Sequence, residues 1–237
     1  MSIETNPLYS LCTSCMGRLD HLQATLPLSL AHEDCEVLLV DYSCPQLAAD
    51  WAERAFPAEI KAQLLRLFRV TGRTVYHCTH AKNVTHIRAR GEILVNADAD
   101  NFIDREYLDK CTEWFRDPNI QLVHPVPWDS RTASCGMFGR IAIRRSAYRA
   151  LGGYDEALIG WGGDDYDLVN RAVAMGFATG TIAHSYLKVI DHGDALRTRY
   201  AASKNKDDSA ARNTEISIAK RKRGEFVANQ YQTIGAI

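Results

Sequence analysis

This chain has 237 residues, of which 46% are hydrophobic, so it can bury a sizeable core without disulfide bridges or a structural metal, and we expect a single domain. Its 28 basic and 29 acidic residues leave a net charge of −1, which gives the chain as a whole no electrostatic reason to bind nucleic acid or an anionic membrane. There is no apolar run of membrane-spanning length and no secretory-signal pattern, and the seven cysteines suit a reducing compartment, so the sequence predicts a cytoplasmic protein.

The first part of the chain alternates apolar strands with helical segments. Strands are predicted at 8–13, 35–41 and 63–70, and helices at 18–30, 46–55 and 81–90. This order predicts an α/β fold with a mostly parallel sheet flanked by helices and a ligand crevice at the carboxyl ends of the strands. Asp41 stands at such an end, where contact with a nucleotide and ordinary turn chemistry explain it equally well.

Two aspartates follow the next apolar strand, which begins near Gly91. Asp98 and Asp100 are alternate residues, so in an extended segment their side chains point the same way. Grouped carboxylates suit a hard cation such as Mn²⁺ or Mg²⁺. A calcium-binding EF-hand loop is excluded because Phe102 and Ile103 stand where an oxygen ligand and a glycine are required. A solvated acidic loop is the alternative, and the position after a buried strand favours metal.

The second part of the chain continues the alternation less regularly. Helices are predicted at 104–115 and 145–151, a proline-bounded loop at 125–131, and strands at 120–124, 136–143, 177–183 and 185–190. His192 follows the last strand and precedes Gly193. A metal ligand and a structural histidine are equally good explanations of His192 on this pattern.

An acidic, glycine-containing loop over 160–167 precedes a predicted helix that ends before Gly176. Its sequence is Gly-Trp-Gly-Gly-Asp-Asp-Tyr-Asp. Capping of a helix needs one aspartate, whereas this loop has three, among them Asp164 and Asp165. The indole of Trp161 can pack on the apolar face of a sugar, and Gly162 and Gly163 leave room for it. The loop therefore predicts a carbohydrate site rather than a capped structural helix.

The last part of the chain is polar. We expect a mobile segment over 195–208, which becomes ordered when a donor binds, and a final helix over 214–223. The basic run over 220–223 is explained better by a solvated helix end than by a phosphate-binding patch.

Together these pieces resemble a GT-A-type glycosyltransferase of the family-2 kind. The stretches 13–22 and 83–101 resemble the donor-binding half of that family, and 136–167 is similar to the C-terminal region of β-1,4-galactosyltransferases. The resemblance covers residues 8–193. It implies one domain of 237 residues, with a nucleotide-sugar-binding half over about 8–124, an acceptor and catalytic half over about 125–193, and a mobile loop with a C-terminal helix over 194–237.

The resemblance also implies roles for individual residues. Asp165 matches the general base of the inverting enzymes, and Asp41 and Asp98 match donor contacts. The implied ligands of Mn²⁺ or Mg²⁺ are Asp98, Asp100 and His192, and the implied acceptor contacts are Trp161, Gly162, Gly163 and Asp164. Two departures are Tyr166, where the galactosyltransferases have a third acidic residue, and Tyr42, where a second aspartate is usual.

The sequence therefore predicts an inverting, metal-dependent transfer from a nucleotide-sugar, with a UDP-sugar favoured, to a carbohydrate or another hydroxyl acceptor. The helix N-terminus is expected to lower the pKa of Asp165, whereas a closed site and the neighbouring Asp164 and Asp167 are expected to raise it again, and the sequence leaves the balance open. A nucleic-acid acceptor is disfavoured, since only the basic run at 220–223 supports it. A sugar nucleotidyltransferase needs a glycine-rich loop where only Gly17 stands, and intact acidic motifs disfavour a non-catalytic carbohydrate-binding protein.

Overall fold

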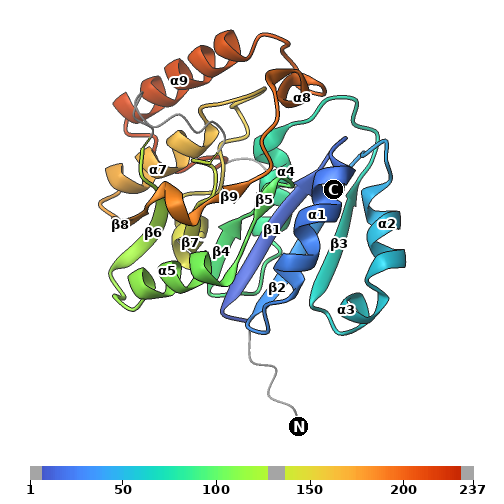
Figure 1. The fold of residues 1–237 in the computed structure, drawn as a ribbon. Coiled ribbons are helices and arrows are strands. Elements are labelled where there is room, and N and C mark those ends of the chain that lie inside the picture. Colours follow the sequence, from blue (N-terminus) through green and yellow to red (C-terminus); the bar gives the residue numbers. More distant parts are fainter. Residues whose placement is uncertain (1–6, 128–136, 231–237) are drawn as a thin grey trace.

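The computed structural model describes residues 7–127 and 137–230. A seven-stranded sheet runs through the molecule in the order β3-β2-β1-β4-β7-β6-β8 (Figure 1). Its strands are β1 (Tyr9–Cys15), β2 (Cys35–Tyr42), β3 (Leu65–Val70), β4 (Ile93–Asn96), β6 (Ile120–Pro125), β7 (Ala142–Arg144) and β8 (Ala178–Ile182). Only β7 is antiparallel to its neighbours in this sheet, so the predicted mostly parallel sheet is confirmed.

Helices cover both faces of the sheet. They are α1 (Leu19–Leu30), α2 (Ala48–Ala55), α3 (Pro57–Lys61), α4 (Cys78–His86), α5 (Arg105–Phe115), α6 (Arg145–Ala150), α7 (Asp164–Ala174), α8 (Asp194–Thr198) and α9 (Lys206–Lys222). The strands feed two cores because successive side chains point to opposite faces. In β2, for example, Val37 and Leu39 belong to the core that includes residues of α1, α2 and α5, whereas Leu38 belongs to the core that includes residues of α6 and α7.

A second, two-stranded sheet stands beside the main one. β5 (Asn101–Phe102) pairs antiparallel with β9 (Lys188–Val189), which follows a short 3-10 helix (His184–Tyr186). The strand predicted over 185–190 is therefore mostly wrong, since it is reduced to two residues. The strand predicted over 136–143 is also shorter than expected: β7 begins at Ala142, and residues 128–136 lie outside the described part of the chain.

The last helix is longer than the sequence predicts. α9 begins at Lys206 rather than at 214, with the side chain of Asn205 accepting hydrogen bonds from the backbone at its start. Because α8 covers Asp194–Thr198, the loop expected over 195–208 is wrong at both of its ends. α9 lies across α7 (Figure 1) and buries Ser209, Asn213 and Ser217. These residues have helical spacing but are polar, and a pattern search for apolar residues misses them.

A buried arginine of α7 fixes this helix to the turn after α6. Arg171 is 1% exposed, and its Nε donates to Asp167 Oδ2 at 2.7 Å. Its two terminal nitrogens donate to the backbone oxygens of Leu151 and Gly153, each at 2.8 Å. The guanidinium therefore holds the helix that carries the acidic loop against the loop after α6.

Replacement of this arginine tests how much the fold depends on it. We expect Arg171→Met to lower the free energy of unfolding by about 3–5 kcal/mol, because the carboxylate of Asp167 stays buried without its partner. Urea unfolding monitored by circular dichroism measures the loss. The control is Arg149→Met, which changes an exposed arginine on α6 and should alter stability by less than about 0.5 kcal/mol. Equal stability of the two variants would contradict the assignment.

Candidate active site

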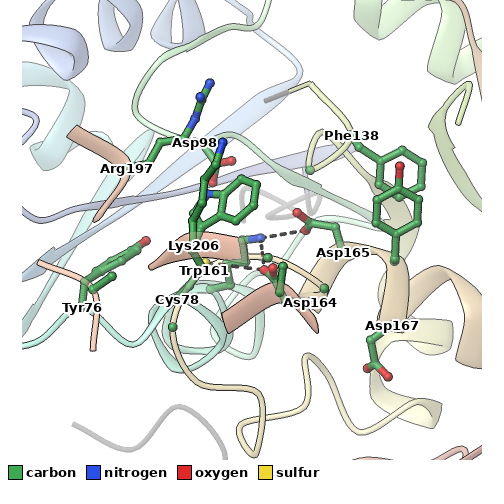
Figure 2. Close-up of a pocket in the computed structure, with 18 of the residues that line it drawn as sticks. Tyr76, Cys78, Asp98, Phe138, Trp161, Asp164, Asp165, Asp167, Arg197 and Lys206 are labelled. Carbon is green, nitrogen blue, oxygen red and sulfur yellow. Dashed lines mark hydrogen bonds and ion pairs between the residues drawn. The ribbon is translucent and has the colours of Figure 1, made fainter. Parts of the chain in front are cut away.

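A cavity of about 730 Å³ lies where the carboxyl ends of β1 and β4 meet α7 and α9 (Figure 2). Most of the residues singled out in the sequence contribute to its wall: Asp98, Asp100, Trp161, Gly162, Gly163, Asp164, Asp165 and His192. The crevice predicted at the strand ends is thus present. The two acidic motifs, which lie more than sixty residues apart in the sequence, face the same space.

Asp41 does not line this cavity. One oxygen of its carboxylate accepts from the backbone N–H of Cys44 at 2.7 Å, and the other accepts from that of Ala49 at 2.9 Å. The side chain therefore holds the turn between β2 and α2. Of the two explanations that the sequence left open, this geometry favours turn chemistry, and contact with a nucleotide stays a prediction.

Asp100 and His192 form the centre of the candidate metal site. His192 Nε2 lies 2.6 Å from Asp100 Oδ2, although the two residues are 92 positions apart. The pairing of β5 with β9 brings them together, and the backbone N–H of Ile190 donates to the Asp100 carbonyl at 2.9 Å. His21 of α1 completes a group of three side chains whose ligand atoms all lie within 4.8 Å of one another.

Arg18 lies beside this pair. Its Nη1 is 3.2 Å from Asp100 Oδ2 and 3.2 Å from His192 Nε2. Burial raises the pKa of Asp100, but the hydrogen bond with His192 and the Arg18 charge outweigh burial and lower this pKa below its ordinary value. The carboxylate is therefore ionised, which is the protonation state that a metal ligand needs, and Arg18 balances its charge.

Asp98 faces a different part of the cavity. A turn follows β4, in which the backbone N–H of Asn101 donates to the Asp98 carbonyl, so the alternation expected of an extended segment does not hold. Among the described residues, Asp98 is not part of the group that could share one cation. A Cβ atom at Gly139 would lie 3.3 Å from Asp98 Oδ2 and 2.8 Å from Asp165 Oδ2, so glycine lets both carboxylates approach the turn before β7.

The two glycines of the acidic loop allow α9 to pack closely against it. Gly162 and Gly163 have φ angles of 85° and 86°, in the left-handed region that side chains other than glycine rarely adopt. Cβ atoms there would lie 3.0 Å from the Cβ atoms of Ala210 and Asn213. The sequence assigned this space to a sugar, whereas the structure fills the space behind the loop with the last helix. The Trp161 ring still faces the cavity, with Lys206 Nζ 5.6 Å from its centre.

A buried lysine joins the two aspartates that begin α7. Lys82 Nζ lies 2.7 Å from Asp164 Oδ2 and 2.7 Å from Asp165 Oδ1, and the dashed lines in Figure 2 end on these carboxylates. The side chain of Lys82 is 3% exposed. Burial disfavours its charge, but the two carboxylates raise the pKa of Lys82 well above its ordinary value. Sequence reasoning missed Lys82, although it lies in a helix that buries every residue from Thr79 to His86.

The environment separates the two aspartates electrostatically. Burial and the negative charge of Asp164 raise the pKa of Asp165 to about 7, although Lys82 acts in the opposite direction. Burial also opposes the charge of Asp164, but the bond and charge of Lys82 lower the pKa of Asp164 below its ordinary value. Asp167, which the sequence expected to contribute, is neutralised by Arg171 instead. Asp165, unlike Asp164, therefore titrates near neutral pH, and its side chain is 20% exposed.

Comparison with known proteins gives the class of enzyme and the fold. Residues 124–193 match a family model described as the N-terminal domain of galactosyltransferase, and this stretch contains the acidic loop and His192. The chain is a glycosyltransferase of the GT-A fold. No curated protein matches the sequence of this glycosyltransferase. None of the described helices is long and apolar enough to cross a membrane.

Three solved structures illustrate the shared fold. A mannosyltransferase from Pyrobaculum calidifontis, in complex with GDP-Man and Mn²⁺, is 19% identical with a TM-score of 0.64, over 93% of this chain and 76% of that one. S. aureus TarS residues 1–349, in complex with UDP, is 11% identical with a TM-score of 0.62, over 91% and 72%. GalNAc-T7, with UDP, GalNAc and Mn²⁺, is 16% identical with a TM-score of 0.65, over 91% and 48%.

The lysine bridge can be tested through the pH dependence of stability. Without the ammonium group, two buried carboxylates face each other, so Lys82→Met raises their pKa values in the native state. The native state then binds protons more tightly than the unfolded state, and stability falls as pH rises. We expect a loss of about 3–5 kcal/mol at pH 8 and a clearly smaller loss at pH 5.5 in urea unfolding.

The matched control for this variant is Lys206→Met. Lys206 lines the same cavity, but it pairs with Asp194 at 2.7 Å near the surface, with 27% of its side chain exposed. Its replacement should cost less than about 1 kcal/mol at either pH. A loss for Lys82→Met that is the same at both pH values would show that packing, rather than the two carboxylates, determines the effect.

Proposed function

We propose that this glycosyltransferase is an inverting, metal-dependent enzyme that moves a sugar from a UDP-sugar to an acceptor hydroxyl, with Asp165 as the general base. The observation that carries the proposal is the carboxylate of Asp165, whose pKa is raised to about 7 and which opens into the cavity shared with Asp98, Asp100 and His192. A base with a pKa near ambient pH is both available and effective.

In the proposed reaction, Asp165 accepts the proton of the acceptor hydroxyl while that oxygen forms a bond to the anomeric carbon of the donor sugar. The bond between this carbon and the diphosphate oxygen breaks on the opposite face, so the configuration inverts and the nucleoside diphosphate leaves. Lys82 holds the carboxylate of Asp165 in place through its Oδ1. Oδ2, which lies toward Gly139, is then the oxygen that faces the acceptor.

The residues around Asp100 fit a divalent cation. An ionised carboxylate, the imidazole of His192 and the nearby His21 are the oxygen and nitrogen ligands that Mn²⁺ accepts. When bound, the cation would neutralise charge that develops on the departing diphosphate. Arg18 carries a second positive charge at the same place, and its guanidinium suits the phosphate oxygens. We then assign Asp98 to donor binding, at the edge of the cation site rather than among the side chains that could share the cation.

The ligands of the similar structures support the choice of donor, and the cysteines support the choice of cellular compartment. Two of the similar structures were solved with UDP and one with GDP-Man, which supports a nucleoside diphosphate sugar and favours UDP. The six cysteines of the described residues are free thiols, although the sulfurs of Cys15 and Cys44 are only 3.8 Å apart. Thiols that close suit a reducing compartment, so we assign the enzyme to the cytoplasm.

The metal assignment predicts that UDP binding requires Mn²⁺. In isothermal titration calorimetry, Asp100→Ala should weaken UDP binding by at least about tenfold, equivalent to roughly 1.4 kcal/mol, because the carboxylate and the diphosphate share one cation. The control variant Asp109→Ala removes an exposed aspartate of α5 and should bind UDP as the wild type does. Binding of UDP with undiminished affinity in EDTA would refute the metal assignment.

The base assignment predicts a loss of transfer without a loss of donor binding. Asp165→Asn keeps the size of the side chain but cannot accept the proton, so transfer should fall by about 10²- to 10⁴-fold. Release of UDP from UDP-sugars with Mn²⁺ measures transfer and donor hydrolysis. A nucleotidyltransferase would release no UDP from these donors and would instead need added pyrophosphate, with which it would form UTP and a sugar 1-phosphate. Metal-dependent UDP binding and the melting temperature check that the donor site and the fold are intact.

The same assignment fixes the pH profile of the wild type. Only the ionised carboxylate accepts a proton, so the rate should be constant above a pH of about 7 and fall about tenfold per unit below it. If Asp165 merely begins α7, asparagine serves equally well and the variant should retain wild-type turnover. That outcome would remove Asp165 from the mechanism.

A further inference from the structure

The cavity continues past Asp165, away from the metal site, and an aromatic pair lies there. The rings of Phe138 and Tyr166 are stacked, with centres 3.9 Å apart and planes 7° from parallel. Figure 2 shows Asp165 between Asp98 and this pair. The chain itself requires the proximity, because Tyr166 follows Asp165 and Phe138 precedes Gly139. A flat apolar surface therefore adjoins the base on the side opposite the donor.

The basic run at the end of α9 reaches the same part of the cavity with one residue. Lys220 pairs with Asp155 at 2.6 Å, and Arg223 pairs with Glu225 at 2.6 Å. Lys222 is exposed. Arg221 instead lines the cavity, one turn after Ser217, whose hydroxyl bonds to Asp167 at 2.6 Å. The four consecutive cations thus differ in their surroundings: Lys220 pairs with a buried carboxylate, Arg223 forms a surface ion pair, Lys222 is exposed and Arg221 is turned inward.

Arg221 has a buried hydrogen-bond donor for which the described residues supply no acceptor. Its Nε is buried and has no hydrogen-bond acceptor among the described residues. Basic residues stabilise the negative end of a helix, which accounts for Lys222 and Arg223 at the surface. This helix-end effect does not account for the buried Nε–H group of Arg221. A buried N–H group without an acceptor costs free energy unless another molecule supplies the acceptor. A guanidinium in this situation suits an oxyanion, which can accept two parallel hydrogen bonds.

We propose that Arg221 binds an anionic group, a phosphate or a carboxylate, on the acceptor sugar, whose ring packs against Phe138 and Tyr166. The inference rests on the proposed function, because Asp165 places the reacting hydroxyl of the acceptor next to this surface. The donor diphosphate has its own cationic partners at Arg18 and the metal site, on the other side of Asp165. A positive charge at the α7–α9 end is therefore available to the acceptor, and the enzyme selects acidic sugars.

The test observes the arginine directly. The Nε–H signal of Arg221 in nitrogen-15 NMR spectra is assigned by its disappearance in Arg221→Gln. The protein is saturated with UDP and Mg²⁺, so that the anion positions of the donor site are filled. Glucosamine 6-phosphate, glucuronic acid and neutral N-acetylglucosamine are the three probes. We expect the phosphate or the carboxylate sugar to shift this signal in a saturable manner and to bind about tenfold more tightly than the neutral sugar.

Matched variants decide between a specific site and general charge attraction. Arg221→Gln should abolish the preference for the acidic sugar, whereas Lys222→Gln removes one positive charge from the same turn and should keep it. The two acidic probes distinguish phosphate from carboxylate recognition. An Arg221 signal that none of the probes moves, or a preference that survives Arg221→Gln, would overturn the proposal. UDP binding in the same samples reports on the proposed function separately, since Arg221 does not contact the Asp100 site.

Discussion

The candidate active site depends on one buried ammonium group. Lys82 extends from α4, on the donor side of the chain, to the two carboxylates that begin α7, about eighty residues later. Two adjacent aspartates in a closed cavity would repel each other, and both would take up protons. The lysine lets Asp164 stay ionised, and the charge of Asp164 in turn raises the pKa of Asp165 into the range where a base is useful. The position and the basicity of Asp165 therefore come from the same contact.

The other support of the acidic loop is polar packing from α9. Ser209 Oγ accepts from the backbone N–H of Trp161 at 3.0 Å, and Asn213 donates to the Gly162 carbonyl at 2.8 Å. Ser217 donates to Asp167 at 2.6 Å. Three side chains on one face of the helix thus satisfy backbone and carboxylate groups that would otherwise be buried without partners. Because these contacts are directional, α9 fixes the path of the loop more closely than apolar packing would.

The sequence predicted the layered part of the fold because its signals are local. The apolar runs of β1, β2 and β4 and the amphipathic helices between them have the expected periods, and the parallel order follows from their alternation. It failed where structure depends on distant partners. α9 has no apolar stripe, since its buried face consists of hydrogen-bonded polar residues, and β9 is two residues long and exists because β5 pairs with it.

The site could be predicted as a set of residue types but not as a geometry. Asp98, Asp100, Asp164, Asp165 and His192 do face one cavity, as the strand-end positions and the resemblance implied. The turn after β4 separates Asp98 from Asp100, and no local pattern signals it. The role of Lys82 was missed for a related reason. A lysine in a predicted helix is expected at the surface unless the carboxylates that surround it in the fold are known.

The contact between Asp100 and His192 also limits the order in which parts of the chain can fold during synthesis. It closes a loop of 92 positions through a pair of two-residue strands, which have too few hydrogen bonds to form by themselves. The N-terminal layers can fold from contacts close in sequence. The β5–β9 pair and the contact between Asp100 and His192 can form only after the segment that follows β8 has been made. A nascent chain that ends before β9 therefore has Asp100 and Arg18 without the imidazole, and the full site arises late in synthesis.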